Sequence, residues 1–273
     1  MPLTPELQTR LRRIQGRHNA QVKDLRRAFT AAELTTSGAC AIEGLRIVEE
    51  AIRSGLRFEA VFFSESAINK AERLLPQIGS HVETLLLPDT LFSSAVPSES
   101  PQGVAALVRV KSFTLADLLR TPETGPVIAL AGIQDPGNLG TVLRSAEAFG
   151  AAGVLIGDNT VSPFNSKVVR ASAGSLFRLP VVRVNLAETI PQLREKGLRL
   201  FATSSHKGTA LEQANLKGPT AVFIGSEGAG LPRAVTSLLD DSIVIPHAAQ
   251  VESLNAGIAA SILLYEAARQ RKG

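Results

Sequence analysis

The sequence predicts an α/β protein in which a mixed α/β part is followed by a domain built on a parallel β-sheet. Hydrophobic residues make up 44% of the 273 residues, yet the chain has eleven Phe, one Tyr and no Trp, so its core must be aliphatic and rich in alanine. Such a core suits buried parallel strands. From residue 127 onward, short apolar runs alternate with segments of helical spacing, which is the pattern of strands joined by helices. The length favours two domains of ordinary size.

The first hundred residues have the pattern of a mixed α/β domain. Helical spacing covers 4–15 and 20–29, and apolar residues at intervals of three and four predict a further helix over 44–54. The other expected elements are strands at 58–63, 81–87 and 104–110, a helix at 67–77 and a loop at 97–103.

A domain boundary is predicted within residues 111–126. A short amphipathic segment there is followed by two prolines and a glycine within 121–126, which marks a linker or turn. The predicted organisation is an N-terminal domain over 1–110, a linker over 111–126 and a C-terminal domain over 127–273.

The C-terminal domain has regularly alternating elements. Strands are expected at 127–133, 154–157, 181–184, 198–202, 221–225 and 242–245. Helices are expected at 141–149, 164–175, 231–239 and 253–268. Ligands of parallel sheets bind beyond the carboxyl ends of the strands. The polar residues that follow these strands are therefore the candidates for a functional site.

Cysteine and histidine usage narrows the class of protein. A single cysteine, Cys40, excludes an internal disulfide and a cysteine-based metal site, and is typical of the reducing cytoplasm. The four histidines have no spacing typical of metal ligands, so no metal is expected. The first residues are polar and then basic, unlike a signal peptide, and the apolar stretches fall short of the roughly 20 residues of a membrane span. We therefore expect a cytoplasmic protein without a membrane partner.

The net charge of +4 is modest, but basic residues crowd the N-terminal segment. They are Arg10, Arg12, Arg13, Arg17, Lys23, Arg26 and Arg27. Only Glu6 and Asp24 oppose them. Such a cluster is typical of a surface that binds a phosphate backbone. For the segment taken alone, a solvated helix face is an equally good interpretation.

Three polar, glycine-rich clusters follow strands of the C-terminal domain: residues 134–140 with Arg144, residues 224–232 and residues 245–255. In the first, Gly137 and Gly140 favour a tight turn, and Asn138 and Arg144 are expected to face the same space. In the third, Ser253 is the expected N-cap of the last helix. Each cluster alone also fits an ordinary strand–turn–helix connection.

The second cluster has three glycines in six residues but is not a nucleotide-binding loop. It lacks the dinucleotide-binding fingerprint and the Walker ending, which disfavours a nucleotide-dependent oxidoreductase. Its Glu227 would repel a pyrophosphate and suits a cationic or hydrogen-bond-donating ligand. Asn255, in the third cluster, is not readily explained by helix propensity.

Together the clusters resemble the three motifs of the SpoU (TrmH-type) family of RNA 2′-O-ribose methyltransferases, of the SPOUT class. The motifs are Asn138-x-Gly140-x-x-x-Arg144, then Gly225-x-Glu227-Gly228-x-Gly230-Leu231, and finally Ile245-Pro246 followed by Ser253-Leu254-Asn255 and a helix through Glu266. Residues 41–44, which open a helix containing Val48, resemble the RNA substrate-binding domain often fused to this family. That domain is similar to ribosomal proteins that bind RNA turns. The resemblance covers nearly the whole chain.

The resemblance implies a fold, a partner and a cofactor. The catalytic domains of the family are parallel α/β sheets with a deep trefoil knot, and they form homodimers around it. The implied methyl donor is S-adenosylmethionine, held largely by backbone groups. By motif position these contacts fall at Gly225, Ile245 and Leu254. Thr203, at the end of a preceding strand, is a further candidate.

The resemblance also implies catalytic residues for transfer to a ribose 2′-hydroxyl: Arg144, Asn138, Glu227, Ser253 and Asn255. The family's favoured general base falls at Arg144, but a guanidinium is effectively always protonated. We favour the hypothesis that Arg144 holds the target phosphate and stabilises the nascent alkoxide. Asn138 would orient the ribose, and Asn255 would brace the loop. Glu227 and Ser253 would help to arrange Arg144 and the hydroxyl.

Two positions depart from the family pattern. Ser226 stands where the second motif usually has Asn, so a hydrogen bond is lost or relayed by water. His247 stands where Met often follows Ile-Pro, and a neutral histidine could fill the same space. A partly buried loop histidine is a better interpretation of His247 than a catalytic one.

The expected substrate is structured RNA, recognised by shape and backbone. Ribosomal RNA is favoured over transfer RNA, because the accessory domain is similar to ribosomal RNA-binding modules. The alternative is a non-catalytic, dimeric RNA-binding protein with a methyltransferase-like domain, which the intact Asn138, Arg144, Glu227 and Ser253 disfavour. Methylation of a base is a further alternative, and the first and third motifs favour the ribose.

Overall fold

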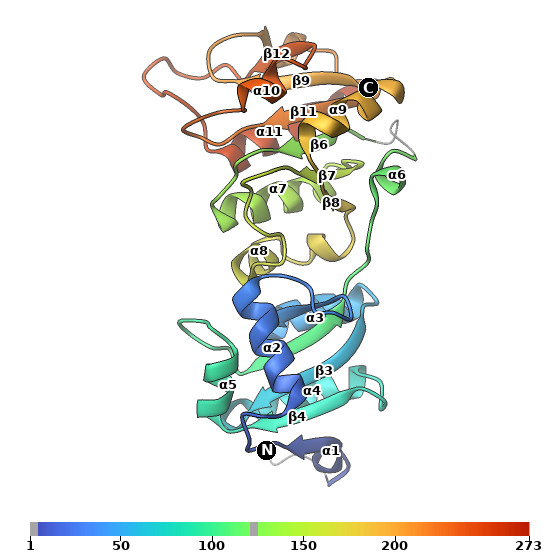
Figure 1. The fold of residues 1–273 in the computed structure, drawn as a ribbon, viewed down its shortest axis with the longest axis vertical. Coiled ribbons are helices and arrows are strands. Elements are labelled where there is room, and N and C mark those ends of the chain that lie inside the picture. The colour runs from blue at the N-terminus through green and yellow to red at the C-terminus, as the bar shows by residue number, and fades with distance from the viewer. Residues whose placement is uncertain (1–4, 121–124, 273) are drawn as a thin grey trace. The chain divides into compact units, whose positions relative to one another are not determined.

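The computed structural model describes residues 5–120 and 125–272 (Figure 1). Its contacts divide the chain into two compact units. The first contains residues 1–111 and 162–177, and the second contains residues 112–161 and 178–273. The domain boundaries expected from the sequence stay a prediction, and residues 121–124 of the expected linker lie outside the described residues.

The first unit is built on a five-stranded mixed sheet in the order β1-β4-β3-β5-β2. The strands are β1 (Leu11–Arg13), β2 (Ala39–Glu43), β3 (Arg57–Ser64), β4 (Glu83–Leu87) and β5 (Val104–Arg109). β4 pairs in parallel with β1 and β3, whereas β5 pairs antiparallel with β2 and β3. The mixed α/β character expected for this part is therefore confirmed.

Short helices surround this sheet. They are α1 (Pro5–Arg10), α2 (Ala20–Ala31), α3 (Leu45–Arg53), α4 (Asn69–Leu74), α5 (Asp89–Ala95) and α8 (Ser166–Ala171). The core forms where α2 and α5 pack on the sheet, with Leu25, Phe62 and Phe92 among its fully or almost fully buried side chains. α8 packs against β2, although it is separated from it by more than a hundred residues of sequence.

The prediction of one helix over 4–15 is wrong in its second half. Residues 11–13 form β1, because tertiary contacts hold this stretch at the sheet edge and override local periodicity. The Arg10 guanidinium donates to the carbonyls of Leu75 and Ile78 at 2.6 and 2.9 Å, which fixes the end of α1. Strand β2 and helix α5 were not predicted either. The sequence of β2, Ala-Cys-Ala-Ile-Glu, is too poor in typical strand formers to be noticed.

The second unit contains a seven-stranded sheet in which every pairing is parallel, in the order β10-β12-β9-β11-β6-β7-β8 (Figure 1). The strands are β6 (Val127–Leu130), β7 (Gly153–Ile156), β8 (Val181–Arg183), β9 (Arg199–Ser204), β10 (Thr209–Ala210), β11 (Thr220–Ile224) and β12 (Asp241–Val244). The predicted parallel sheet is confirmed. Its central strands β6 and β11 are buried throughout, as their apolar sequences require.

Helices cover this sheet. They are α6 (Leu115–Leu118), α7 (Pro136–Ala148), α9 (Leu186–Glu195), α10 (Arg233–Thr236) and α11 (Ala256–Lys272). Side chains of α6, α9 and α10 form one apolar cluster with the sheet, and α11 packs along α7. In the parts of the chain that the structure describes, no helix is long and apolar enough to cross a membrane.

Candidate active site

The three polar clusters meet beyond the carboxyl ends of β6 and β11. Asn138 Nδ2 donates to Glu227 Oε1 at 2.8 Å, although 89 residues separate them. Asn255 Nδ2 donates to Asn138 Oδ1 at 2.8 Å and to Glu227 Oε1 at 3.0 Å. The backbone amide of Ala256 donates to the same carboxylate oxygen at 3.1 Å. One residue from each cluster therefore contributes to a single polar triad: Asn138, Glu227 and Asn255.

Asn255 is also the N-cap of α11. Its Oδ1 accepts hydrogen bonds from the amides of Gly257 and Ile258 at 3.0 and 3.2 Å. The prediction that Ser253 caps this helix is therefore wrong, and the helix begins at Ala256. Asn is as good a cap as Ser, and the negative charge of Glu227 is favourable beside the helix N-terminus. The cap and the triad are thus made by the same side chain.

Asn138 lies in the first turn of α7, not in a loop. Pro136 occupies the first helical turn, and the Asp135 side chain caps the helix by accepting from the Asn138 amide at 2.8 Å. The tight turn predicted from Gly137 and Gly140 is wrong, since neither glycine has a positive φ. The cap from Asp135 and the fixed backbone of Pro136 favour a helix start here, and this outweighs the low helix propensity of Gly137 and Gly140. This start fixes the backbone of Asn138.

The loop after β11 is a closed turn that requires a glycine at its base. A Cβ on Gly225 would lie 2.1 Å from the carbonyl carbon of Gly230 and 2.3 Å from the nitrogen of Leu231. The Gly230 amide donates to the Ser226 carbonyl at 2.8 Å, and the Ala229 amide to the Ser226 hydroxyl at 3.3 Å. Ser226 therefore finds a partner inside its own loop, which accommodates its departure from the family's Asn.

A cavity of about 250 Å³ lies beside this loop. Thr203, Gly225, Ile245 and Leu254, which were expected to hold the cofactor, all line it. Ser253 lines it as well. The Thr203 hydroxyl donates to the Phe223 carbonyl at 3.0 Å and so belongs to the sheet's own bonding.

His247 lies at the same cavity, and its Nδ1 is 2.7 Å from the Ile245 carbonyl oxygen. This short contact to its own loop agrees with the interpretation of His247 as a partly buried loop residue. Within the described ranges, no group of three or more His, Cys, Asp or Glu could hold a metal ion.

A second, larger cavity of about 970 Å³ shares Glu227 and its loop with the first. Asp135, Asn138 and Asp158 contribute to its wall, from the carboxyl ends of β6 and β7. Asn159, which follows, adopts a left-handed conformation with φ of +58°, uncommon for a residue other than glycine. Sequence reasoning did not single out Asp158 or Asn159, although both directly follow a predicted strand.

Arg144 lies apart from this arrangement. It is exposed on α7, lines neither cavity, and has no side-chain partner among the residues described. Arg144 lies six residues after Asn138 on the same helix. At about 100° per residue, the two side chains point roughly a third of a turn apart around the helix axis. A single chain therefore brings together Asn138, Glu227, Ser253 and Asn255, and does not bring Arg144 to them.

The surface of α11 beside α7 is apolar and exposed. Ile258, Ile262 and Tyr265 recur at intervals of four and three residues and are 53, 38 and 56% exposed. The ring of Tyr265 contacts that of Phe149 edge-on at 5.8 Å between centroids. An apolar stripe of this kind typically packs against another surface.

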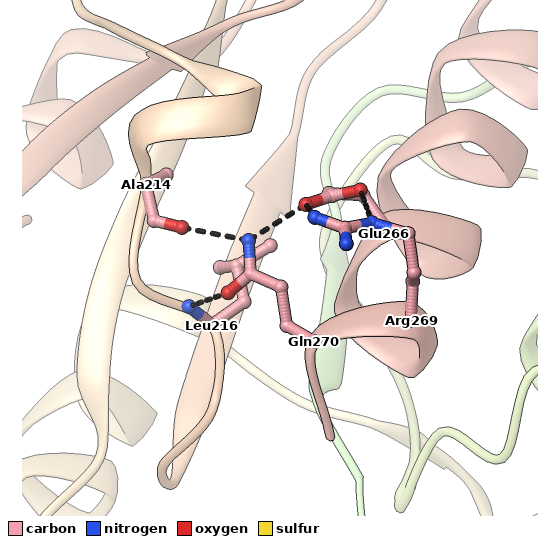
Figure 2. Close-up of polar contacts among 5 residues, drawn as sticks. All are labelled: Ala214, Leu216, Glu266, Arg269 and Gln270. Atoms are coloured by element: carbon pink, nitrogen blue, oxygen red, sulfur yellow. Dashed lines mark hydrogen bonds and ion pairs between the residues drawn. The ribbon is translucent and has the colours of Figure 1, made fainter. Parts of the chain in front are cut away.

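The far end of α11 is fixed by Gln270 (Figure 2). Its side chain accepts from the Leu216 amide at 2.8 Å and donates to the Ala214 carbonyl at 2.9 Å and to Glu266 at 2.8 Å. Arg269 donates to both oxygens of Glu266 at 2.7 and 2.8 Å. The hydrogen bonds from Arg269, and then that from Gln270, lower the pKa of Glu266 to about 2. The helix that carries Asn255 is therefore held at both ends.

Comparison with known proteins decides the family. Residues 125–265 match the model of the SpoU rRNA Methylase family, and residues 19–106 match the MRM3-like substrate binding domain. The chain belongs to the SpoU rRNA methylase family. The resemblance inferred from the motifs is thus confirmed.

Relatives of this SpoU methylase match it over nearly its full length. It is 32% identical to the 23S rRNA (guanosine(2553)-2′-O)-methyltransferase RlmP of Bacillus subtilis, over 93% of this chain and 98% of RlmP. The SpoU methyltransferase AviRb of Streptomyces viridochromogenes in complex with AdoMet superimposes with a TM-score of 0.80 at 28% identity, covering 94% of this chain and 99% of AviRb. An AdoMet-bound rRNA methyltransferase of Sinorhizobium meliloti superimposes with a TM-score of 0.78 at 27% identity, covering 95% of this chain and 98% of that protein.

Proposed function

We propose that the protein transfers the methyl group of S-adenosylmethionine to a ribose 2′-hydroxyl of ribosomal RNA. The observation that carries the proposal is the triad of Asn138, Glu227 and Asn255, whose Glu227 lines both cavities. RlmP of Bacillus subtilis and RlmB of Vibrio parahaemolyticus are both named as 23S rRNA guanosine 2′-O-methyltransferases, which supports ribosomal RNA over transfer RNA. Such a substrate is encountered in the cytoplasm.

The smaller cavity fits the cofactor. Ile245 and Leu254 contribute apolar side chains to its lining, and Gly225 and Glu227 line it as well. The bound cofactor supplies a methyl group on a positively charged sulfonium, and a nearby carboxylate favours a cation. Backbone recognition explains why the residues at these positions need no polar side chains.

The larger cavity is the proposed place of the acceptor nucleotide, because Asn138 and Glu227 both line it. Glu227 Oε1 accepts three hydrogen bonds, whereas within the described residues none reaches Oε2. That oxygen is free to accept a hydrogen bond from the ribose hydroxyl or from an arginine. The Asn138 amide is fixed from both ends, so its remaining hydrogen-bonding positions are preorganised for the ribose.

We further propose a homodimer in which Arg144 acts in the site of the partner chain, and in which the sheet carries the trefoil knot of the family. Two observations support the dimer. Arg144 is exposed and lines neither cavity of its own chain. The apolar stripe of Ile258, Ile262 and Tyr265 lies on the helix that packs against α7, which carries Arg144. In this position Arg144 would hold the phosphate and stabilise the alkoxide.

Mixed dimers test this arrangement. Arg144→Ala and Asn138→Ala chains are each expected to be inactive alone. Co-expressed with different tags and purified as a heterodimer, they regain one intact site if Arg144 acts across the interface. A heterodimer as inactive as both parents would contradict the arrangement. Ile262→Glu is expected to give a monomer by light scattering, since it places a charge in the stripe.

The proposed reaction is tested by mapping 2′-O-methyl groups in total RNA from cells with and without the protein. We expect one ribosomal position to lose its methyl group and to regain it on complementation with the wild type but not with Asn138→Ala. An unchanged map would contradict the proposal. A lost position in transfer RNA would retain the reaction and overturn the substrate.

A further inference from the structure

A third cavity lies in the first unit, and no residue of the polar triad lines it. Its volume is about 940 Å³, and it is lined by α3, by α8, by Lys70 of α4 and by residues of the loop that precedes β5. Four cationic side chains contribute to it: Arg46, Lys70, Lys167 and Arg170. Only Glu43 and Glu99 oppose them. None of these side chains has a role in the proposed reaction.

Arg170 is fixed by a buried carboxylate. The side chain of Glu43 is 1% exposed and lies 3.1 Å from Arg170 Nη1, whereas Arg170 is 38% exposed. A buried carboxylate requires such partners, and it also accepts from the Gln102 amide at 2.8 Å. A guanidinium has five N–H donors, and within the described residues only one donor of Arg170 makes a hydrogen bond, to Glu43. This bond neutralises the charge of Glu43 and leaves the other donors of Arg170 available for a ligand.

The loop at the edge of the cavity is held from two directions. Gln102 donates its amide to Glu43, and its carbonyl accepts from the Lys70 ammonium. The two remaining cations, Arg46 and Lys167, are exposed and have no side-chain partner within residues 5–120 and 125–272. The cavity is thus a preorganised basic site in which two cations are positioned and two are uncommitted.

The N-terminal basic segment, by contrast, is largely committed to its own fold. Arg12 pairs with Glu83 at 3.1 Å, and Arg13 pairs with Glu65 at 3.0 Å. Arg10 donates to the backbone carbonyls of Leu75 and Ile78, and Arg26 donates to that of Ser94. The segment expected from the sequence to bind phosphates therefore retains few free charges, of which Lys23 and Arg27 lie on α2.

We propose that the cavity around Arg46, Lys167 and Arg170 binds phosphates of the RNA backbone, and that it is the main electrostatic contact of the first unit with the substrate. The inference rests on the proposed function for the identity of the polyanion. The site is composite. Arg46 lies in the stretch matching the substrate-binding domain, whereas Lys167 and Arg170 lie in the stretch matching the methylase. Guanidinium and ammonium groups together suit successive phosphates.

The test compares two double variants of the full chain. Each removes two exposed cations of the first unit that have no side-chain partner among the described residues. Arg46→Gln/Lys167→Gln alters the cavity, and Lys23→Gln/Arg27→Gln is the matched control on α2. Binding to protein-free 23S ribosomal RNA is measured by filter retention over a series of KCl concentrations. The slope of log K against log salt is negative. We expect the cavity variant to reduce its magnitude by about 2, one for each lost phosphate contact. The control is expected to keep the slope of the wild type.

Equal slopes for all three proteins, or a reduced slope only in the control, would overturn the proposal. Circular dichroism and thermal unfolding show whether each variant is folded, and calorimetry with S-adenosylmethionine alone is expected to give wild-type affinity for both. Inorganic phosphate alone serves as the second probe: if it binds the cavity while the variant leaves RNA binding unchanged, the site serves a free phosphate and the RNA assignment fails. Absence of methyl transfer by the wild type would contradict the proposed function without altering these slopes.

Discussion

Replacing Asn255 by Ala should both destabilise the second unit and disable the site, because one side chain makes the helix cap and the triad. Loss of an N-cap costs about 1 kcal/mol. The two hydrogen bonds to Asn138 and Glu227 add about 0.5 kcal/mol each, at the low end of the usual range because Asn255 is exposed. The free energy of unfolding should therefore fall by about 2 kcal/mol, which corresponds to roughly 4–8 °C in the melting temperature.

Asn255→Ser separates the two effects. Serine retains a capping oxygen for the amides of Gly257 and Ile258 but cannot donate to both triad partners. We expect about half of the stability loss, measured by urea denaturation, and a loss of methyl transfer on the order of 100-fold in both variants, since the triad is misplaced in each. If the Ser variant were as active as the wild type, the bridging role of Asn255 would be refuted.

Two further perturbations test the loop and the C-terminal helix. Gly225→Ala should abolish S-adenosylmethionine binding, measured by calorimetry, because its Cβ would overlap the backbone of Gly230. Gly228→Ala is the control and should bind normally, because its Cβ meets nothing within 4 Å. Equal affinities of the two variants would contradict the requirement for glycine at the base of the turn. Arg269 and its neighbour lower the pKa of Glu266 to about 2 from 4.5, so the stability that this carboxylate contributes is complete above pH 4.5 and is lost as the pH falls towards 2. The difference in unfolding free energy between the wild type and Glu266→Gln should therefore shrink over that window, and a constant difference would rule out this contribution.

The sheet of the second unit could be predicted from sequence because its strands are buried, apolar and separated by helices. The details of the site could not. Asn138 looked like a loop residue because glycines flank it, yet the Asp135 cap and Pro136 start the helix earlier. Asn255 looked like an awkward helical residue because the contacts that explain it, to Asn138 and Glu227, join positions 117 and 28 residues away. A pattern within one short segment of sequence cannot reveal contacts between residues so far apart along the chain.

In the first unit, the pairing of charged side chains could not be predicted from the sequence either. The basic residues near the N-terminus are conspicuous in the sequence, but Arg10, Arg12 and Arg13 bind groups on β4 or in the segments around α4. The partnership of Arg170 with Glu43 spans 127 residues and shows only in three dimensions. Whether a cation is available to RNA depends on which acceptors the fold brings to it, so a count of charges along the chain is a poor guide.

Methyl transfer to a ribose hydroxyl is best tested by identifying the methylated product. Purified protein is incubated with methyl-labelled S-adenosylmethionine and protein-free ribosomal RNA, and the RNA is digested to nucleosides and analysed by mass spectrometry. We expect label in one 2′-O-methyl nucleoside, and loss of that label with Asn138→Ala while S-adenosylmethionine binding persists. Label in a base-methylated nucleoside, or undiminished transfer by Asn138→Ala, would contradict the proposed ribose methylation.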